Sequence, residues 1–199
     1  MASRPLYIPH LEIEVARTLR YRGHSWHDLH HDLKKEGLRM PLLSEFMTLL
    51  KTEELSLDDG TLLTPPRRKV IQRNFLGREY ATYGALLDAQ FFHKEERWYL
   101  RQGHHLGSNG IDLQFAEEHP LEDLLLSTGV IDLDHISSLG IPQNTAKKGG
   151  ISYRPPQDRC VACYSVKQGK ASLLFDYDPN TLDFLVGVYP ARDRRSAVA

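Results

Sequence analysis

Two cysteines, Cys160 and Cys163, form a Cys-x-x-Cys pair, a spacing that can serve as half of a zinc site, a redox pair or a pair of copper-binding thiols. In an extended strand, residues three apart lie on opposite faces about 10 Å apart, whereas a disulfide requires roughly 7 Å or less. The chain has no second Cys-x-x-Cys to complete a four-thiol zinc site. We therefore favour two small strand residues, with a thiol-dependent enzyme using copper or zinc as the alternative.

The ten histidines are the one unusual feature of the composition. Four polar residues would lie within about 100° of one another on a helix and could ligate zinc or a similar ion: His24, His27, Asp28 and His31. A solvated polar face explains the same pattern, and we favour that interpretation, with no bound metal. His30 lies beside the apolar stripe, and His104 and His105 form a loop pair with no third partner visible in the sequence.

A basic run consisting of Arg67, Arg68, Lys69 and Arg73 could contact the phosphates of a nucleic acid. Acidic residues elsewhere nearly cancel it, because 25 Lys+Arg stand against 26 Asp+Glu and the formal net charge is −1. A general binder of polyanions would carry a basic excess. We therefore favour a solvated surface segment over a nucleic-acid contact. No Ser-His-Asp, phosphate-loop or dinucleotide-binding pattern occurs in a usable context.

Length and composition indicate one soluble domain, because 199 residues can bury a sizeable core and 41% of them are hydrophobic. No apolar run reaches the length of a membrane-spanning helix, and the first residues lack the apolar stretch of a secretory signal. Two cysteines cannot build a disulfide scaffold, so packing must stabilise the fold. We expect a cytoplasmic or virion-associated protein with no membrane span.

The first half of the chain favours helices. Apolar residues at helical spacing within residues 25–37 predict a helix capped by Ser25 and ended by Gly37. A second helix is predicted to begin at Pro41, a favourable first helical residue. Residues 52–66 are expected to be a loop blocked by their final Pro-Pro pair, and residues 67–84 fit no single pattern.

The second half favours strands, which gives an α+β class with helices early and sheet late. Alternating or compact apolar patterns predict strands in four segments: residues 87–100 as a hairpin, then 161–164, 171–175 and 184–189. A short helix is expected after His119-Pro120, and residues 140–158 are expected to be an exposed loop.

Two of these segments stand in a recognisable order. Residues 25–29, Ser-Trp-His-Asp-Leu, open the first helix, and residues 37–46, Gly-Leu-Arg-Met-Pro-Leu-Leu-Ser-Glu-Phe, lead into the second. This resembles the signature of the formylglycine-generating (sulfatase-modifying) branch of the C-type-lectin fold, where a Ser-Trp-x-Asp-Ala helix precedes Arg-Leu-Pro-Thr-x-x-Glu-Trp. Arg39, Pro41 and Glu45 match that pattern, whereas Leu42 replaces its Thr. Residues 186–189, Val-Gly-Val-Tyr, are similar to the closing Leu-Gly-Phe-Arg strand of the same superfamily.

A closer resemblance is to the variable, ligand-binding proteins of diversity-generating retroelements, especially archaeal ones, and to their undiversified relatives. Their Leu-Asp-Ala-x-Phe hairpin, Pro-Leu-Glu-x-x-Leu helix and Val-Ala-Arg-Phe strand are similar to residues 87–91, 120–125 and 161–164. The resemblance implies a C-type-lectin-like fold with two early helices and a late antiparallel sheet. It implies one domain over residues 21–191, after an N-terminal extension or first strand at 1–20 and before a polar tail at 192–199.

In the variable proteins, the residues between the Val-Ala strand and the closing Gly strand form the exposed ligand surface. The resemblance places ten residues of this chain on that surface: Ser165, Lys167, Gln168, Lys170, Ser172, Leu174, Asp176, Tyr177, Asp178 and Asn180. Tyr177 is the expected anchor, because tyrosine offers a large rigid contact and a hydroxyl. The apolar residues 173–175 are unlike a recently diversified surface and are equally compatible with a structural hairpin.

The resemblance favours a non-enzymatic binding module that presents a recognition surface to a protein or other macromolecule and needs no cofactor. One alternative is a metal- or thiol-dependent oxidase related to formylglycine generation, although those oxidases place four residues between their active cysteines and this chain places two. Another alternative is a structural or receptor-binding component of a virus or mobile element.

Overall fold

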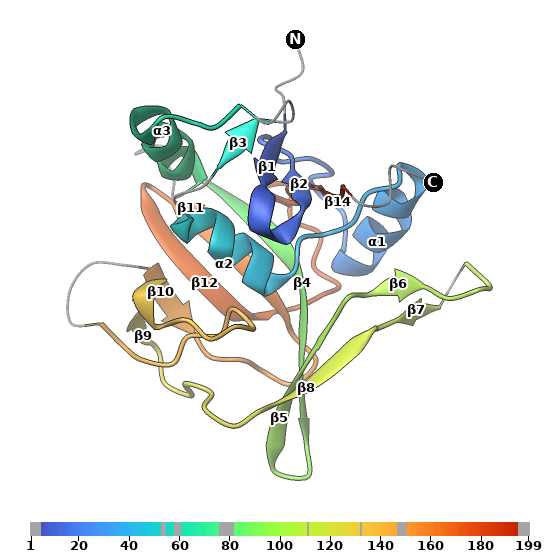
Figure 1. The fold of residues 1–199 in the computed structure, drawn as a ribbon. Helices are drawn as coiled ribbons and strands as arrows, with labels where there is room; N and C mark the ends of the chain where they lie inside the picture. Colours follow the sequence, from blue (N-terminus) through green and yellow to red (C-terminus); the bar gives the residue numbers. More distant parts are fainter. Residues whose placement is uncertain are drawn as a thin grey trace.

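The structure, a computed structural model, describes residues 5–52, 55–57, 61–75, 82–110, 112–131, 133–146 and 151–194, with the backbone alone for 71–75. This part of the chain combines helices with largely antiparallel sheets, and the α+β class predicted from the sequence is confirmed (Figure 1). Within the same ranges, no helix is both long and apolar enough to cross a membrane.

Helix α1 (Trp26–Lys35) forms where the sequence predicts it. The Ser25 hydroxyl accepts a hydrogen bond from the backbone N–H of Asp28 at 3.1 Å, which satisfies one of the unpaired donors at the start of the helix. Gly37 follows the helix with a φ of 66°, a left-handed conformation that glycine adopts without strain. The apolar stripe beginning at Trp26 is fully buried, so the helical spacing identified the packed face.

Helix α2 (Leu43–Lys51) begins later than predicted, and helix α3 (Pro65–Phe75) forms where no helix was predicted. Helix α2 begins two residues after Pro41, and the Glu45 carboxylate accepts the backbone N–H of Leu42 at 2.8 Å. The expectation of a loop through the Pro-Pro pair is wrong, because a proline in the first turn has no intrahelical donor to lose and its φ already suits the helix. Two short 3-10 helices, η1 (Pro9–Leu11) and η2 (Leu133–His135), complete the described helices.

Eight of the described strands form the larger sheet, in the order β8-β5-β4-β11-β12-β10-β9 with β13 beside β4. Most neighbours are antiparallel, but β10 runs parallel to β12 and β13 runs parallel to β4. The strands are β4 (Thr82–Lys94), β5 (Arg97–Gln102), β8 (Glu117–Leu121), β9 (Gly129–Ile131), β10 (Ile151–Arg154), β11 (Val161–Lys167), β12 (Lys170–Tyr177) and β13 (Val186–Gly187).

Two tight hairpins lie at the centre of this sheet and confirm the predicted alternation. Strands β4 and β5 turn at Glu95 and Glu96, whose φ angles are 52° and 62°. Strands β11 and β12 turn at Gln168 and Gly169, whose φ angles are 50° and 74°. Left-handed backbone at both central residues is the geometry that matches the twist of paired strands.

Two other expectations for this region are wrong. Residues 117–121 form strand β8 against β5 instead of starting a helix, and the leucines with helical spacing pack against the main core from an irregular segment. Strand β10 lies within the predicted loop at 140–158, because its pairing with β9 and β12 comes from distant parts of the chain. The strand predicted at 184–189 is reduced to the two residues of β13.

The beginning and the end of the described chain meet in a second sheet, in the order β14-β2-β1-β3. Its strands are β1 (Leu6–Ile8), β2 (Ile13–Val15), β3 (Ser56–Leu57) and β14 (Ala191–Asp193). Arg192 and Asp193 therefore lie in a strand and not in a tail, and Arg192 pairs with the buried Glu14 at 2.6 Å. The short strands β6 (His105–Leu106) and β7 (Leu113–Gln114) form a separate pair.

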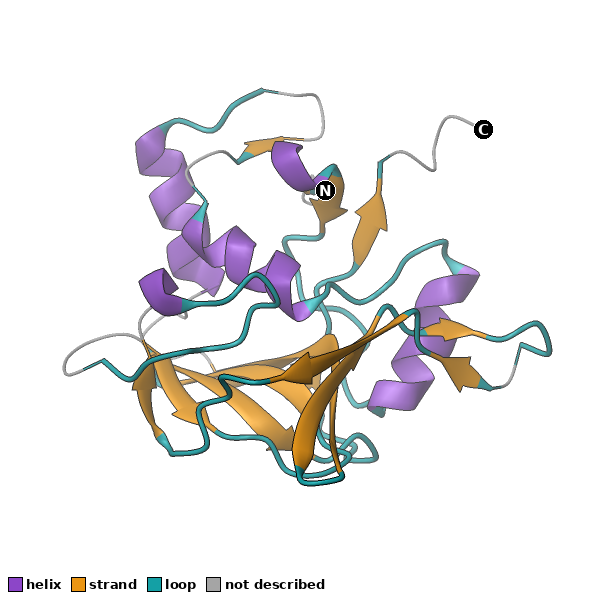
Figure 2. Cartoon of the chain, turned by 60° about the horizontal axis from the view of Figure 1, so that its bottom comes forward, coloured by secondary structure: helices purple, strands orange, loops and turns teal. Residues whose placement is uncertain are grey.

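Two clusters of buried apolar residues occupy opposite faces of the larger sheet, because neighbouring residues of a strand point to opposite sides. The main core contains Tyr164 and Phe175 and is completed by α2. The minor cluster joins Trp26 of α1 to Leu86 and Cys163. Helix α1 accordingly lies apart from α2 and α3 (Figure 2).

Candidate functional site

Strand β12 presents two different faces. Leu173 and Phe175 are fully buried in the main core. The residues on the other face, with their neighbours on β10 and β11, are half-buried or exposed. We call this set the open face, and it consists of Ser152, Arg154, Ser165, Lys167, Lys170, Ser172, Leu174 and Asp176. The alternation of β11 and β12 thus brings six of the ten residues predicted on the ligand surface onto one side of the sheet.

Charged side chains lie at both ends of the open face. Arg154 of β10 pairs with Asp176 of β12 at 2.9 Å, and the Arg154 side chain is 55% exposed. Lys167 and Lys170 face each other across the hairpin and are both exposed. Gln168 lies in the turn between them and is also exposed. The open face thus carries three cations and one carboxylate among serines and a leucine, so it can combine hydrogen bonding with modest electrostatic attraction.

Tyr177 follows a shift in the pairing of strands β11 and β12. Val161 is opposite Tyr177 but Cys163 is opposite Leu174, so β12 carries one extra residue between these pairs. The Tyr177 ring packs against the minor cluster, as Leu174 of the open face also does, and its hydroxyl is buried and, within the described chain, has no hydrogen-bond partner. Burial raises the pKa of Tyr177. The structure therefore places this residue at the edge of a packed cluster and not at the centre of an exposed surface.

Residues 178–185 connect β12 to β13 and carry apolar side chains that the sequence analysis did not single out. The exposed fractions are 63% for Leu182, 81% for Phe184 and 46% for Leu185. The sequence signal that could have identified them is the Asp-Pro-Asn turn at 178–180, which ends β12 and takes the following residues out of a regular strand. Asp178 and Asn180 are exposed in this turn, where the Asp178 carboxylate accepts the backbone N–H of Asn180 at 2.9 Å.

A shallow hollow of about 540 Å³ lies between this connection and helix α1. Leu182 lines one side, and Gly23 and the outward face of α1 line the other. The Phe184 ring lies against Gly23, where an added Cβ would come within 2.9 Å of it. Gly23 also has a φ of 79°, so glycine is required there both by the backbone and by the ring.

The four residues of the alternative metal site do not form one ligand group. His24, Asp28 and His31 line the hollow beside α1, and His27 is not among its lining residues. His24 pairs through Nδ1 with Asp32 at 2.9 Å, and the Asp28 carboxylate accepts the Ser25 hydroxyl at 2.6 Å. These contacts already satisfy the polar groups of a solvated helix face.

The two cysteines occupy environments that disfavour thiolates. Cys163 is 1% exposed in the minor cluster, and burial raises its pKa to about 12. Cys160 is half-buried, and burial raises its pKa as well, helped by the carboxylates of Asp176 and Asp178. Both cysteines are free. Since the thiolate is the form that binds metals and attacks electrophiles, neither residue has the environment of a reactive thiol.

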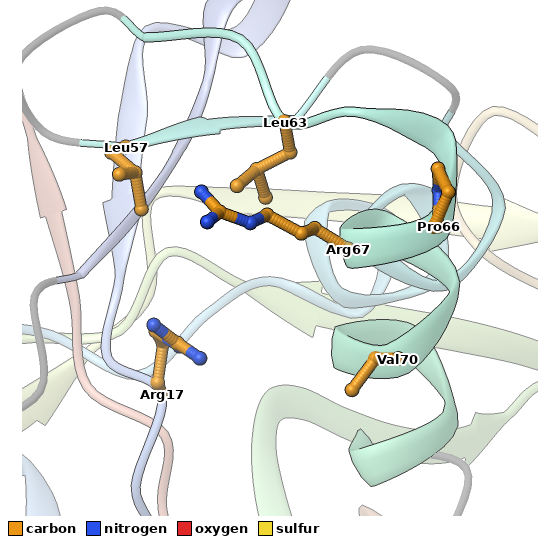
Figure 3. Close-up of a pocket in the computed structure, with 6 residues that line it drawn as sticks. All are labelled: Arg17, Leu57, Leu63, Pro66, Arg67 and Val70. Carbon is orange, nitrogen blue, oxygen red and sulfur yellow. The ribbon is translucent and has the colours of Figure 1, made fainter.

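The predicted basic run begins helix α3 but does not form a continuous basic face. Arg67 extends toward Arg17 across a cavity of about 410 Å³ whose other walls include Leu57, Leu63 and Val70 (Figure 3). Arg68 is half-buried and Lys69 is exposed, while the side chain of Arg73 lies outside the described residues. Arg67 therefore lines this cavity while remaining exposed.

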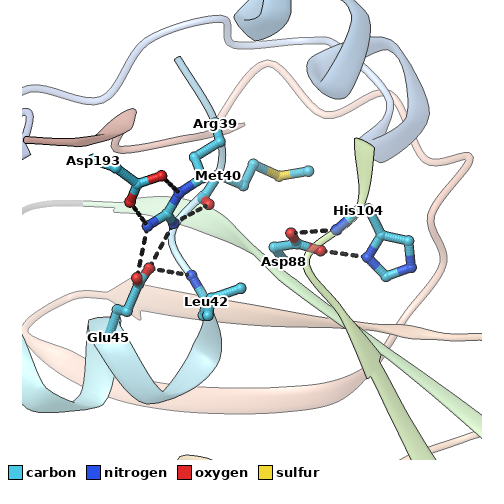
Figure 4. A network of polar contacts seen from close by, with 7 residues as sticks. All are labelled: Arg39, Met40, Leu42, Glu45, Asp88, His104 and Asp193. Carbon is cyan, nitrogen blue, oxygen red and sulfur yellow. Dashed lines mark hydrogen bonds and ion pairs between the residues drawn. The ribbon is translucent and has the colours of Figure 1, made fainter. Parts of the chain in front are cut away.

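Two polar clusters lie close to strand β4 (Figure 4). The first is an ion-pair network. The Arg39 guanidinium donates to both oxygens of Glu45 at 2.7 Å, and its Nη2 also donates to Asp193 at 2.6 Å. Main-chain bonds between Arg39 and Ala191, at 2.9 and 2.8 Å, run alongside. Arg39 and Glu45, which match the family signature, thus join the α1–α2 connection to strand β14.

The second polar cluster contains His30, Asp88 and His104, which are 5%, 1% and 7% exposed. Asp88 accepts the backbone N–H of His104 at 2.9 Å and contacts its ring Nδ1 (Figure 4). One ligand-type atom from each of the three residues lies within 4.8 Å of the others. Burial lowers the pKa of His30 to about 3, which keeps this imidazole neutral. The sequence analysis found no third partner for His104, because Asp88 lies on β4 and His30 on α1.

Comparison of the chain with known proteins gave no match among family models, curated proteins or solved structures.

Proposed function

We propose that this protein is a non-enzymatic binding module with a C-type-lectin-like fold, and that it recognises a protein partner through the open face and residues 178–185. The observation that carries the proposal is the group of exposed apolar side chains at Leu182, Phe184 and Leu185, which directly follows the polar strand β12. Single exposed apolar residues are ordinary on a protein surface, but three within four residues indicate a contact surface.

The composition of this region supports a protein ligand. Recognition surfaces commonly combine a few aromatic or aliphatic anchors with surrounding polar groups. Phe184 offers an exposed ring, and the open face supplies serine hydroxyls, two lysines and the Arg154–Asp176 pair. The whole chain has a formal net charge of −1, which gives no general attraction to a polyanion.

The fold assignment within the α+β class rests on the order of the motifs and on one contact. Arg39, Pro41 and Glu45 match the signature, and the Arg39–Glu45 ion pair gives two of these positions a shared role. The raised pKa values of both cysteines favour a binding module over a thiol-dependent oxidase.

A photo-cross-linking residue in place of Phe184 tests the proposal in extracts of the source cells. We expect one discrete cross-linked protein, competed by excess unmodified chain but not by a Leu182→Ser, Phe184→Ser double variant. The matched control carries the same cross-linker at Leu62, which is 66% exposed outside the proposed surface. Equal cross-linking at both positions, or equal competition by the double variant, would contradict the proposal.

A further inference from the structure

The buried cluster of His30, Asp88 and His104 is unusual because its polar groups are not all satisfied. The Nε2 atoms of both histidines are buried and have no hydrogen-bond partner within the described chain. Most buried polar atoms in proteins have such a partner, so two orphaned nitrogens in one cluster require an explanation. A ligand that accepts electron pairs from both nitrogens would provide one.

The charge of the cluster points in the same direction. Asp88 is 1% exposed, and among the ion pairs of the described residues its partner is His104. A buried carboxylate is costly unless it faces a cation or a metal. Lys34 reaches the neighbouring strand β6, where it donates to the carbonyl of Leu106 at 3.4 Å. A small cation bound in the cluster would therefore offset the negative charge of Asp88.

The rings are also held in fixed positions. Trp26 packs edge-on against His30 and His104, with ring centroids 4.5 and 4.8 Å apart, and its indole N–H donates to the carbonyl of Leu87 at 3.0 Å. The contact with Asp88 directs Nδ1 of His104 toward the carboxylate and leaves Nε2 with its lone pair. A carboxylate behind a ligating histidine is the usual support of a metal-binding imidazole.

We propose that His30 and His104 bind one divalent transition-metal ion of the zinc type through their Nε2 atoms, with Asp88 holding His104 in place from behind. Imidazole and carboxylate together suit this class of metal, whereas calcium and magnesium prefer oxygen ligands alone. Ligands bound at about 2.1 Å in a tetrahedral site lie roughly 3.4 Å apart, and the ligand-type atoms of the three residues already lie within 4.8 Å of one another.

The bound ion would act as a structural link, independent of the recognition surface. His30 lies on α1, Asp88 on β4 and His104 directly after β5, so one ion joins three elements that are distant in sequence. Burial of all three residues leaves little access for a substrate. The site therefore fixes helix α1 against the sheet and does not create a catalytic centre.

Zinc titration of the full chain, prepared without a polyhistidine tag and stripped with a chelator, tests this proposal. We expect one equivalent of Zn²⁺ to bind and to raise the melting temperature, and one equivalent of Co²⁺ to give the visible absorption of a tetrahedral site. His30→Leu should weaken binding at least tenfold and abolish that absorption. Because Nε2 of His30 has no partner, this variant should fold without metal.

His105→Gln is the matched control, since His105 is exposed and adjacent to the proposed ligand His104. It should bind both metals as the unmodified chain does. Asp88→Asn, which keeps the shape of the side chain but removes its charge, should weaken zinc binding about 10- to 100-fold. Absence of binding to the unmodified chain, or equal affinity of the His30→Leu variant, would overturn the proposal.

Discussion

The two faces of strand β12 differ in what surrounds them, although the same eight residues form both. On one face, Leu173 and Phe175 are fully buried, and Phe175 stacks on Phe91 with ring centroids 4.3 Å apart. On the other, Ser172, Leu174 and Asp176 are partly exposed. Side chains of the first face have no freedom to vary without loss of packing, whereas those of the second can be selected for binding.

Polar residues show the same contrast across the molecule. The buried cluster around Asp88 and the buried Glu45 depend on specific partners, while Ser152, Lys167 and Lys170 of the open face are exposed. The same residue type therefore stabilises the fold in one place and is available for recognition in another. Burial, more than residue type, decides which role a side chain has.

The largest effect is expected on the buried face of β12. Phe175→Ala should lower the free energy of unfolding by about 4 kcal/mol, because truncation of a buried phenylalanine removes its packing and leaves a cavity. Denaturant unfolding measures this change. Leu174→Ala on the open face is the control and should cost clearly less. Equal losses for the two variants would remove the distinction between the faces.

A smaller loss is expected when a buried charge loses its partner. Arg39→Ala should destabilise the protein by about 3 kcal/mol, since the Glu45 side chain is only 10% exposed and would remain without its main cation. Arg159→Ala is the matched control, because Arg159 is 81% exposed and its 3.7 Å pair with Asp158 should contribute less than about 0.5 kcal/mol. A similar loss in both variants would show that burial does not decide the effect.

The pH dependence of metal-free protein separates His30 from exposed histidines. Burial lowers the folded-state pKa of His30 from 6.5 to about 3, so the unfolded chain binds a proton there first as the pH falls. This contribution to stability is present above pH 6.5 and is lost between pH 6.5 and about 3. In the presence of a chelator, the His30→Leu variant should thus lose less stability than the unmodified chain over that range. Parallel pH curves from thermal unfolding would contradict this.

The smallest effects are expected on the open face itself. Ser172→Ala and Lys170→Ala should each change the free energy of unfolding by less than about 0.5 kcal/mol, because surface substitutions remove no packed contact. Differential scanning calorimetry on the two variants checks this. A loss above about 1.5 kcal/mol would assign these residues to the folding core and not to the recognition surface.

Local patterns predicted the elements whose signals lie within a short stretch of chain. The stripe beginning at Trp26 identified α1, and alternation identified the two central hairpins. The strand β8 was missed because its last residue, Leu121, and the leucines of the irregular segment that follows are spaced as in a helix and pack against the core. The strand β10 was missed because its pairing partners are distant in sequence.

The candidate sites also differ in how far the sequence could predict them. The resemblance marked Ser172, Leu174 and Asp176 as surface residues, and the alternation along β12 explains why they lie on one side of the strand. The position of Tyr177 could not be predicted, since it depends on a bulge defined by pairing with β11. The cluster of His30, Asp88 and His104 could not be predicted either, because α1, β4 and the residue after β5 meet only through the tertiary fold.

The most direct test of the proposed division of roles is a library of all single substitutions at residues 170–177, displayed on a cell or phage surface. Two properties of each variant are measured. Display level reports folding, and capture of the protein cross-linked at Phe184 reports recognition. Leu173 and Phe175 should lose display, whereas Ser172, Leu174 and Asp176 should keep display and lose capture. Loss of display at all five positions, or unchanged capture across the open face, would contradict the proposal that one face folds the protein and the other recognises its partner.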